Sequence, residues 1–132
     1  MENYLEQIAA LIDTKGYARA VDIAEALGIS QASVTNMVKR LASEGFLDYE
    51  KYRGFVMTRP GETLARNIAR RHQLLTDFFR LLGLNERVIQ QDVEGMEHHV
   101  SPSTLRAIEL LSAQLDRQPA LLAKIRSKID AA

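Results

Sequence analysis

The chain has 132 residues, of which 46% are hydrophobic and 26% are charged, and its formal net charge is zero at pH 7. This length suggests one domain or two small ones of ordinary globular composition. The absence of cysteine excludes disulfides, thiolate metal ligands and cysteine nucleophiles. There is no apolar signal core and no run near the roughly 18 apolar residues of a membrane span, so we expect a cytoplasmic protein.

The balanced charge is unevenly distributed. Residues 31–71 carry eight basic and four acidic side chains, so this segment has a net charge of +4. The rest of the chain balances it with −4. A basic block inside a neutral protein is a weak indication of a surface that faces phosphate groups.

Hydrophobic periodicity and helix-capping residues predict a mainly helical chain with one small β-hairpin. In chain order, we expect helices over about 2–14, 20–27 and 31–43, a hairpin within 46–58, and helices over about 59–82, 86–100, 102–116 and from 119 onward. Four helix starts follow a side chain that can cap them: Ser30, Thr58, Asn85 and Ser101. Gly28 and Gly83 stand just past helix ends, where a left-handed residue is favoured.

Three helices followed by a hairpin are the order of a winged helix-turn-helix. Ala24, Gly28 and Val34 fall at the spacing that this motif needs, because a small residue lets the two helices approach, a glycine makes the turn and an apolar residue anchors the second helix. We therefore expect an N-terminal winged helix-turn-helix DNA-binding domain over residues 1–60.

The second helix of the motif would expose short polar side chains and one lysine: Gln31, Ala32, Ser33, Thr35, Asn36 and Lys39. Such side chains can meet base edges in the major groove, while Lys39 can contact phosphate. Arg53 at the hairpin tip would contact the DNA backbone or minor groove. The alternative is a winged helix that binds protein. Single domains of this kind rarely bind DNA well, so we expect a dimer made by the C-terminal helices.

The segment Glu94-Gly-Met-Glu-His-His-Val100 concentrates side chains that can bind metal. On a helix, Glu94, Glu97 and His98 would share one face, whereas His99 would point elsewhere. Carboxylates and imidazoles without sulfur favour Mn, Fe(II), Zn or Co, and carboxylate-rich sites suit Mn(II). Spacing alone leaves a solvated surface helix as the alternative.

Two other helices could complete such a site. A helical hairpin across Gly83 could bring His72 opposite the Glu94–His98 segment. Glu6, with Asn3 one turn earlier, offers ligands on the first helix.

Several segments together resemble the diphtheria toxin repressor family of metal-dependent transcriptional regulators, and within it the short, manganese-responsive branch. The segments that carry the resemblance are Lys15-Gly-Tyr-Ala-Arg19, Asp22-Ile-Ala-Glu-Ala-Leu27, Tyr49-Glu-Lys-Tyr-Arg-Gly54, Arg71-His72 and Asp92-Val-Glu-Gly-Met-Glu-His-His99. The last of these is the most specific, and the resemblance covers nearly the whole chain.

The resemblance implies a homodimeric regulator, not an enzyme, that represses manganese-uptake genes from a palindromic double-stranded operator when Mn(II) is bound. It implies a C-terminal α-helical metal-binding and dimerisation domain over 61–132, joined to the first domain by the helix over about 59–82. It also implies a site for two Mn(II) ions per subunit between the first helix and the dimerisation helices, with Zn(II), Fe(II), Co(II) or Cd(II) as substitutes. No membrane and no organic cofactor are expected. The family's metal ligands match Glu6, His72, Glu94, Glu97 and His98.

The resemblance also implies finer roles for these positions. Glu6 and Glu97 would be shared by the two ions, and Glu94 stands where iron-responsive relatives have cysteine. One residue departs from the family pattern, because Asn3 occupies the position of an aspartate ligand. Its amide carbonyl can still bind a cation but carries no charge. We therefore expect weaker occupancy of that metal site, or an altered metal preference.

Two alternatives remain at this stage. The first is a regulator of the same fold that responds to Fe(II) or Zn(II). The second, more remote, is a small metalloenzyme or metal-storage module, which would leave the Ala24, Gly28 and Val34 pattern unexplained.

Overall fold

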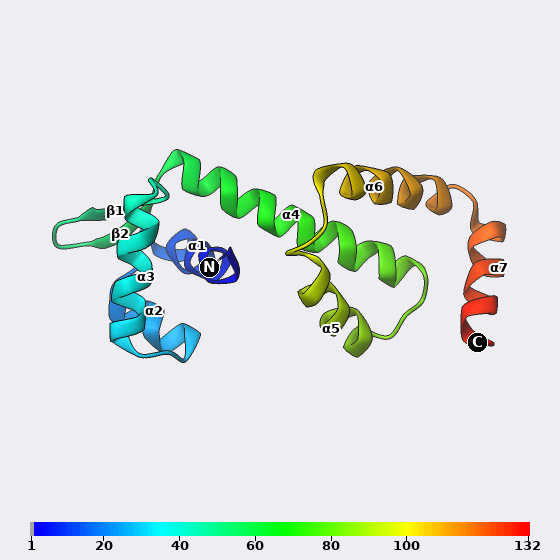
Figure 1. Cartoon of the computed structure of the whole chain (residues 1–132), viewed down its shortest axis with the longest axis horizontal. Helices are drawn as coiled ribbons and strands as arrows, with labels where there is room; N and C mark the ends of the chain where they lie inside the picture. The colour runs from blue at the N-terminus through cyan, green and yellow to red at the C-terminus, as the bar shows by residue number, and fades with distance from the viewer. Residues whose placement is uncertain (1) are drawn as a thin grey trace. The chain divides into compact units, whose positions relative to one another are not determined.

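The computed structural model describes the backbone of residues 2–132 and the side chains of residues 4–132. The chain divides into two compact units, one up to Ala69 and the other from Arg70 onward. The elements in chain order are α1 (Glu2–Lys15), α2 (Ala20–Leu27), α3 (Gln31–Ser43), β1 (Leu47–Glu50), β2 (Gly54–Met57), α4 (Arg59–Leu81), α5 (Glu86–Met96), α6 (Pro102–Asp116) and α7 (Pro119–Asp130) (Figure 1). This is the predicted mainly helical fold with one hairpin.

The predicted capping residues begin the helices. Ser30 Oγ accepts a hydrogen bond from the Ser33 N–H at 3.1 Å at the start of α3. Thr58 Oγ1 accepts from the Gly61 N–H at 3.0 Å at the start of α4. Asn85 and Ser101 cap α5 and α6 in the same way. Because these bonds satisfy N–H groups that have no partner within the helix, they fix the helix starts from local sequence.

In the first unit, α2 and α3 form the helix-turn-helix and pack through buried side chains. Ala24 and Val34 are buried where α2 and α3 meet. Gly28 takes a left-handed conformation, with φ of 66°, and its N–H bonds to the Ala24 carbonyl. These positions therefore do what their spacing predicts: one permits close approach, one turns the chain and one anchors α3.

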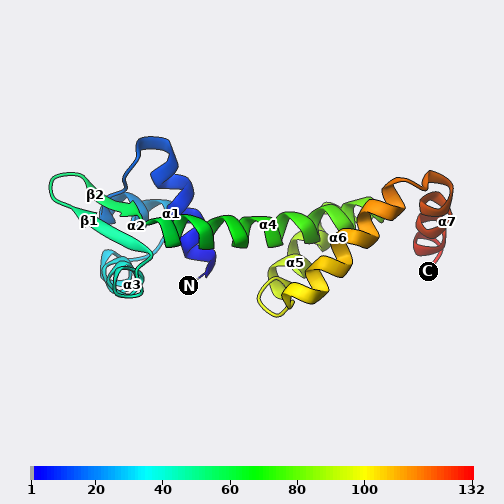
Figure 2. The same ribbon diagram turned by 90° about the horizontal axis from the view of Figure 1, so that it is seen from above.

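The hairpin packs beside the helix-turn-helix. β1 and β2 are antiparallel, with Tyr49 opposite Phe55. Ala18 extends the pairing, because its N–H bonds to the Phe55 carbonyl at 2.9 Å and its carbonyl accepts from the Phe55 N–H at 2.8 Å. The loop of the hairpin projects past α2 and α3 in both views of the first unit (Figure 1, Figure 2). It therefore has the position of a wing.

The second unit has its own apolar core. Leu75 of α4 and Ile89 and Val93 of α5 are almost completely buried. Partly buried side chains surround them: Phe79, Leu84, Met96, Val100, Leu105 and Ile108. α6 thus contributes Leu105 and Ile108 to a core made mainly by the α4–α5 helical hairpin.

One helix boundary differs from the sequence prediction. The helix expected to run to about 100 ends at Met96, and residues 97–99 form a turn in which the His99 N–H bonds to the Met96 carbonyl at 2.9 Å. The cause lies downstream. Ser101 precedes Pro102, and a residue before proline is driven out of helical geometry; its φ and ψ are −72° and 159°. The chain must therefore leave the helix before it can start α6.

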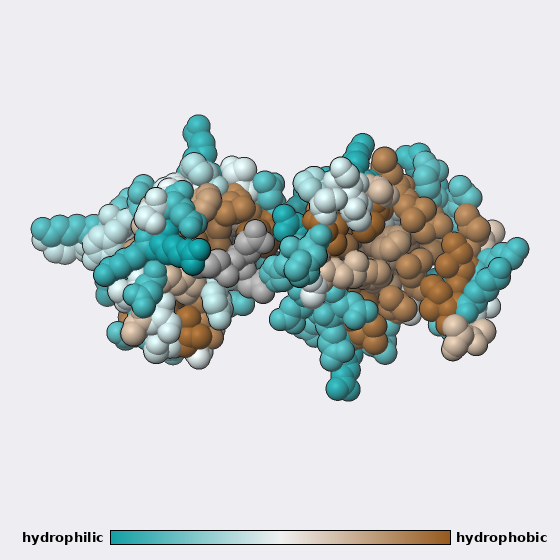
Figure 3. All heavy atoms as spheres, viewed as in Figure 1, coloured by the Kyte–Doolittle hydropathy of each residue, from teal (hydrophilic) through white to brown (hydrophobic). Residues whose placement is uncertain are grey.

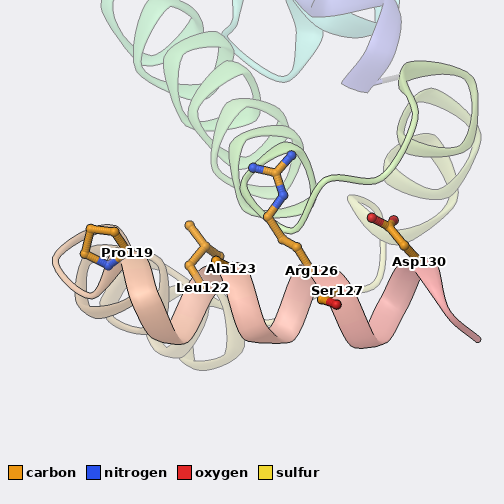
Figure 4. A pocket seen from close by; sticks show the side chains of 6 residues that line it. All are labelled: Pro119, Leu122, Ala123, Arg126, Ser127 and Asp130. Carbon is orange, nitrogen blue, oxygen red and sulfur yellow. The ribbon is translucent and has the colours of Figure 1, made fainter.

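α7 contacts α6 and lies at the edge of a shallow cavity of about 580 Å³. The cavity is lined by Pro119, Leu122, Ala123, Arg126, Ser127 and Asp130 (Figure 4). Arg126 reaches back over the turn after α4, and a Cβ atom at Gly83 would lie only 2.7 Å from its Nε. Of the helices that the structure describes, none has the length and apolar character to cross a membrane.

Candidate DNA-binding surface and metal centre

The residues of α3 predicted to contact DNA lie between Gln31 and Lys39. Gln31, Ala32, Ser33, Asn36 and Lys39 are exposed, and Thr35 is half-buried. The Thr35 hydroxyl donates to the Gln31 carbonyl at 2.9 Å, so this side chain is partly occupied within its own helix. Lys39 has no acidic partner among the described residues. Its ammonium is therefore available to a phosphate.

Two residues stand out at the hairpin tip. Arg53 is exposed, and it also donates to Glu50 Oε2 at 3.3 Å while its guanidinium lies 5.4 Å from the centre of the Tyr17 ring. Tyr52 is 83% exposed, and its φ is 71°. Among the described residues it is the only one other than glycine with a positive φ. Sequence analysis did not single out Tyr52, because a left-handed tyrosine has no local signal.

The second unit brings three of the predicted metal ligands together. His72 lies on α4, Glu97 is the C-cap residue just after α5, and His98 follows it. His72 Nδ1 forms a hydrogen bond to Glu97 Oε2 at 2.8 Å, and His98 Nε2 lies 3.9 Å from Glu97 Oε1. Each oxygen of one carboxylate thus faces an imidazole nitrogen.

Burial distinguishes Glu97 from the other acidic side chains. It is 6% exposed and is the one charged residue buried in the described part of the chain. A buried carboxylate is costly unless it is paired or bound to a cation. One carboxylate between two imidazoles is a donor set that fits a divalent transition metal. As these side chains stand, however, no three His, Asp or Glu residues among those described form a group that could hold a metal.

The remaining predicted ligands are not part of this cluster. Glu94 is exposed on α5, one turn before Glu97. Glu6 is half-buried on α1 in the first unit, where it lines a cavity of about 580 Å³ with Asp13, Glu62 and other residues. The side chain of Asn3 lies outside the described residues.

The contact made by one neighbour of the cluster was not predicted from the sequence. Arg71, immediately before His72, donates from Nη1 to the backbone carbonyl of Glu97 at 2.9 Å. The motif Arg71-His72 was the available signal, but spacing could not show which carbonyl the guanidinium would reach.

A winged helix-turn-helix followed by a helical unit with a carboxylate–imidazole cluster defines a DNA-binding regulator with a metal-binding domain. Residues 1–55 match the family described as "Iron dependent repressor, N-terminal DNA binding domain". Residues 58–122 match "Iron dependent repressor, metal binding and dimerisation domain". The chain belongs to the iron-dependent repressor family, among its MntR-type transcriptional regulators.

Relatives and solved structures agree with this assignment. The chain is 45% identical to the "HTH-type transcriptional regulator MntR" of Lysinibacillus sphaericus (strain C3-41), over 96% of this chain and 91% of that protein. It is 49% identical to the MntR of Bacillus subtilis (strain 168), over 82% and 76%. The structure of the metal-dependent transcriptional regulator MtsR matches with a TM-score of 0.75 at 27% identity, over 83% of this chain and 52% of that one.

The structure of ScaR with bound Zn²⁺ gives a TM-score of 0.73 at 29% identity, again over 83% of this chain and 52% of that one. The chain thus spans about half the length of these solved chains. The resemblance, the fold class and the expectation of a transcriptional regulator rather than an enzyme are confirmed. The metalloenzyme alternative therefore falls away. The chain has a metal-binding domain, and its DNA-binding and dimerisation domains imply a DNA partner and a homodimer.

Proposed function

We propose that this protein is a Mn(II)-responsive repressor that shuts off manganese-uptake genes when Mn(II) is plentiful. The observation that carries the proposal is the buried carboxylate of Glu97 with an imidazole nitrogen facing each of its oxygens. Glu94 adds a hard carboxylate one turn away, where a cysteine would favour softer metals. Manganese is also named for two proteins of similar fold, "the manganese regulator SloR" and "the Manganese-activated Repressor ScaR", at 29% and 28% identity.

The proposed ligands are Glu6, His72, Glu94, Glu97 and His98, with Asn3 as a neutral oxygen donor, and together they would hold two ions per subunit. A bound divalent cation would supply positive charge that links these side chains. The hydrogen bond between His72 Nδ1 and Glu97 Oε2 holds these two side chains against each other, which supports their assignment to one site.

For DNA binding, we propose that a homodimer presents two copies of α3 to a palindromic operator. We propose that this dimer acts in the cytoplasm. The short polar residues at Gln31–Asn36 would meet base edges, and Lys39 and the hairpin tip would contact the backbone. A candidate dimer surface is the apolar patch over α6 and α7, where Leu110, Leu111 and Leu121 are about half exposed (Figure 3). Apolar patches of this kind commonly mark protein interfaces.

The experiment that tests the proposal is fluorescence anisotropy of a labelled manganese-transporter promoter fragment titrated with metal-stripped protein, with and without Mn(II). We expect Mn(II) to tighten DNA binding strongly in the wild type. His98→Ala should lose this response, whereas the matched neighbour His99→Ala should keep it, because His99 is not a proposed ligand. Equal responses of the two variants would remove His98 from the site.

A regulator that responds to Fe(II) or Zn(II) is the second candidate, and it is favoured by Asn3, which carries one negative charge less than the family's aspartate. The same titration repeated with those metals separates the candidates. Activation, rather than affinity, decides between them, because Zn(II) commonly binds more tightly than Mn(II) at any nitrogen–oxygen site. DNA binding that responds only to Zn(II) or Fe(II) would overturn the manganese assignment.

A further inference from the structure

Two adjacent residues of α4 bond to the main chain and to the side chain of Glu97, the C-cap residue of α5. Arg71 Nη1 donates to the backbone carbonyl of Glu97 at 2.9 Å, and His72 Nδ1 bonds to the carboxylate of the same residue at 2.8 Å. Adjacent helix positions point about 100° apart, so a shared target requires a precise approach of the two helices. Glu97 is thereby fixed at both its main chain and its side chain.

Arg71 donates to a carbonyl at the C-terminal end of a helix, where carbonyls lack partners within the helix. This carbonyl belongs to Glu97, the C-cap of α5. A guanidinium there satisfies one of these carbonyls and lies at the negative end of the helix dipole. The turn at residues 97–99, which sets the direction of both Glu97 and His98, is thus anchored to α4 by a half-buried arginine.

We infer that Arg71 is a positioning residue for the metal centre, a role that rests on the proposed function. By clamping the Glu97 carbonyl, it sets the rotation of the α5 C-terminal turn and so places the Glu97 carboxylate opposite His72, with His98 beside it. Arg71 acts through the polypeptide and does not itself donate to the metal, because a guanidinium has no free lone pair at neutral pH. Residues that orient metal ligands in this way typically change metal affinity about 10- to 100-fold when mutated.

The neighbouring Arg70 supplies a matched control. It also lies on α4, but it donates from Nη2 to Glu109 at 3.0 and 3.1 Å on the side toward α6. Replacing Arg70 removes a positive charge and an arginine side chain next to Arg71 in the sequence, but it removes no hydrogen bond to Glu97. Any effect of general charge on cation binding should therefore occur equally in Arg70 and Arg71 variants.

The test measures Mn(II) affinity by calorimetry of metal-stripped, full-length dimer for wild type, Arg71→Met, Arg71→Lys, Arg70→Met and Arg70→Lys. Electron paramagnetic resonance of the bound Mn(II) gives a second readout, because its line shape reports the symmetry of the ligand arrangement. Circular dichroism establishes that each variant is folded at the temperature used. A purely structural role for Arg71 would lower the unfolding temperature but leave affinity and line shape unchanged in the folded protein.

We expect Arg71→Met to weaken Mn(II) binding by about tenfold or more and to alter the line shape, and Arg71→Lys to lie between it and wild type. Both Arg70 variants should stay within about twofold of wild type. If Arg71→Met does not fold, the Mn(II) affinities of Arg71→Lys and Arg70→Lys are compared instead. We then expect Arg71→Lys to bind Mn(II) at least about threefold more weakly than Arg70→Lys. Equal affinities in the folded Arg70 and Arg71 pairs would overturn the inference. Failure of wild type to bind Mn(II) would instead overturn the proposed function.

Discussion

At the scale of single residues, burial separates two glutamates that the sequence treats alike. Glu94 and Glu97 are one helical turn apart, yet Glu94 is exposed and Glu97 is buried against His72. A carboxylate inside a protein needs hydrogen bonds or a cation to offset its lost hydration. Glu97 has such a hydrogen bond, from His72.

The first prediction concerns the charge of Glu97. Glu97→Gln keeps a similar shape and a hydrogen-bonding oxygen but removes the negative charge. We expect Mn(II) affinity to fall at least about 100-fold. The attraction between a dication and a carboxylate, several kcal/mol, is large enough to account for a loss of this size. Calorimetry measures this, with Asp92→Asn on the exposed side of α5 as the control. Similar affinities for the two variants would show that Glu97 is not a ligand.

The second prediction concerns the backbone of Tyr52. A β-carbon in the left-handed region is crowded, at a cost of roughly 1–2 kcal/mol, which glycine avoids. Tyr52→Gly should therefore be about 1 kcal/mol more stable than Tyr52→Ala, although glycine is ordinarily the less stable of the two in regular structure. Urea unfolding of both variants measures the difference. Greater stability of the alanine variant would mean that residue 52 is not left-handed in solution.

At the scale of secondary-structure elements, the hairpin depends on a close approach at Gly54. A Cβ atom there would lie 2.6 Å from the Ala18 carbonyl oxygen, and the backbone φ is 133°. The Ala18–Phe55 pairing that ties the hairpin to the segment before α2 would have to open. The wing is thus positioned by a residue with no side chain.

The third prediction follows from this contact. Gly54→Ala should destabilise the protein by about 3 kcal/mol, because it combines a steric clash with a disfavoured φ. Gly95→Ala is the matched control, since a Cβ atom at that position in α5 meets nothing within 4 Å. It should stabilise the protein by about 0.5–1 kcal/mol through helix propensity. Denaturant unfolding of both variants is the measurement, and a mild effect of Gly54→Ala would contradict the close approach.

The fourth prediction concerns the turn between α4 and α5. Arg80 donates to Glu86 at 2.7 and 3.0 Å, and this hydrogen bond lowers the pKa of Glu86 below the ordinary value of a glutamate. A folded-state pKa below the unfolded one stabilises the protein above the unfolded pKa, near pH 4.3, and that stabilisation is lost as pH falls through the folded pKa.

Glu86→Gln should therefore be less stable than wild type at pH 7, and the difference should shrink as pH falls from the unfolded pKa down through the lower folded-state pKa of Glu86. Because both side chains are exposed, the effect should be small and should shrink in high salt. Urea midpoints of the two proteins between pH 3 and 7 measure it. A difference that persists unchanged at pH 3 would show that Glu86 acts through packing rather than charge.

At the scale of the whole molecule, one chain joins a DNA-binding domain to a metal-binding and dimerisation domain. The proposed recognition helix α3 and the proposed ligand Glu6 lie in the first unit, while His72, Glu97 and His98 lie in the second. A metal response therefore requires that the two binding equilibria are coupled. Such coupling is a free energy shared by both ligands, so it acts equally in both directions.

The fifth prediction is this reciprocity. If Mn(II) raises the affinity of the dimer for its operator by a certain factor, saturating operator should raise the affinity of the dimer for Mn(II) by the same factor. Calorimetric Mn(II) titrations with and without operator DNA measure the second factor, and anisotropy measures the first. Scrambled DNA of equal length is the control. Unequal factors would show that metal changes something else as well, such as the association of the subunits.

Local sequence determined much of this protein. The helix starts at Ser30, Thr58, Asn85 and Ser101 were predictable because a cap acts within three residues of its own position. The helix-turn-helix was predictable from three spaced residues, and the hairpin from its β-rich halves. The residue types of the proposed metal centre also come from the sequence, because carboxylates and imidazoles are chemically distinctive.

The tertiary structure decided what depends on contacts distant in sequence. It buries Glu97 rather than Glu94, directs Arg71 to a carbonyl 26 residues away and holds Arg53 against Tyr17. None of these has a local signal, because each follows from how two elements pack. Residue type thus sets which chemistry is available, and packing selects the atoms that meet.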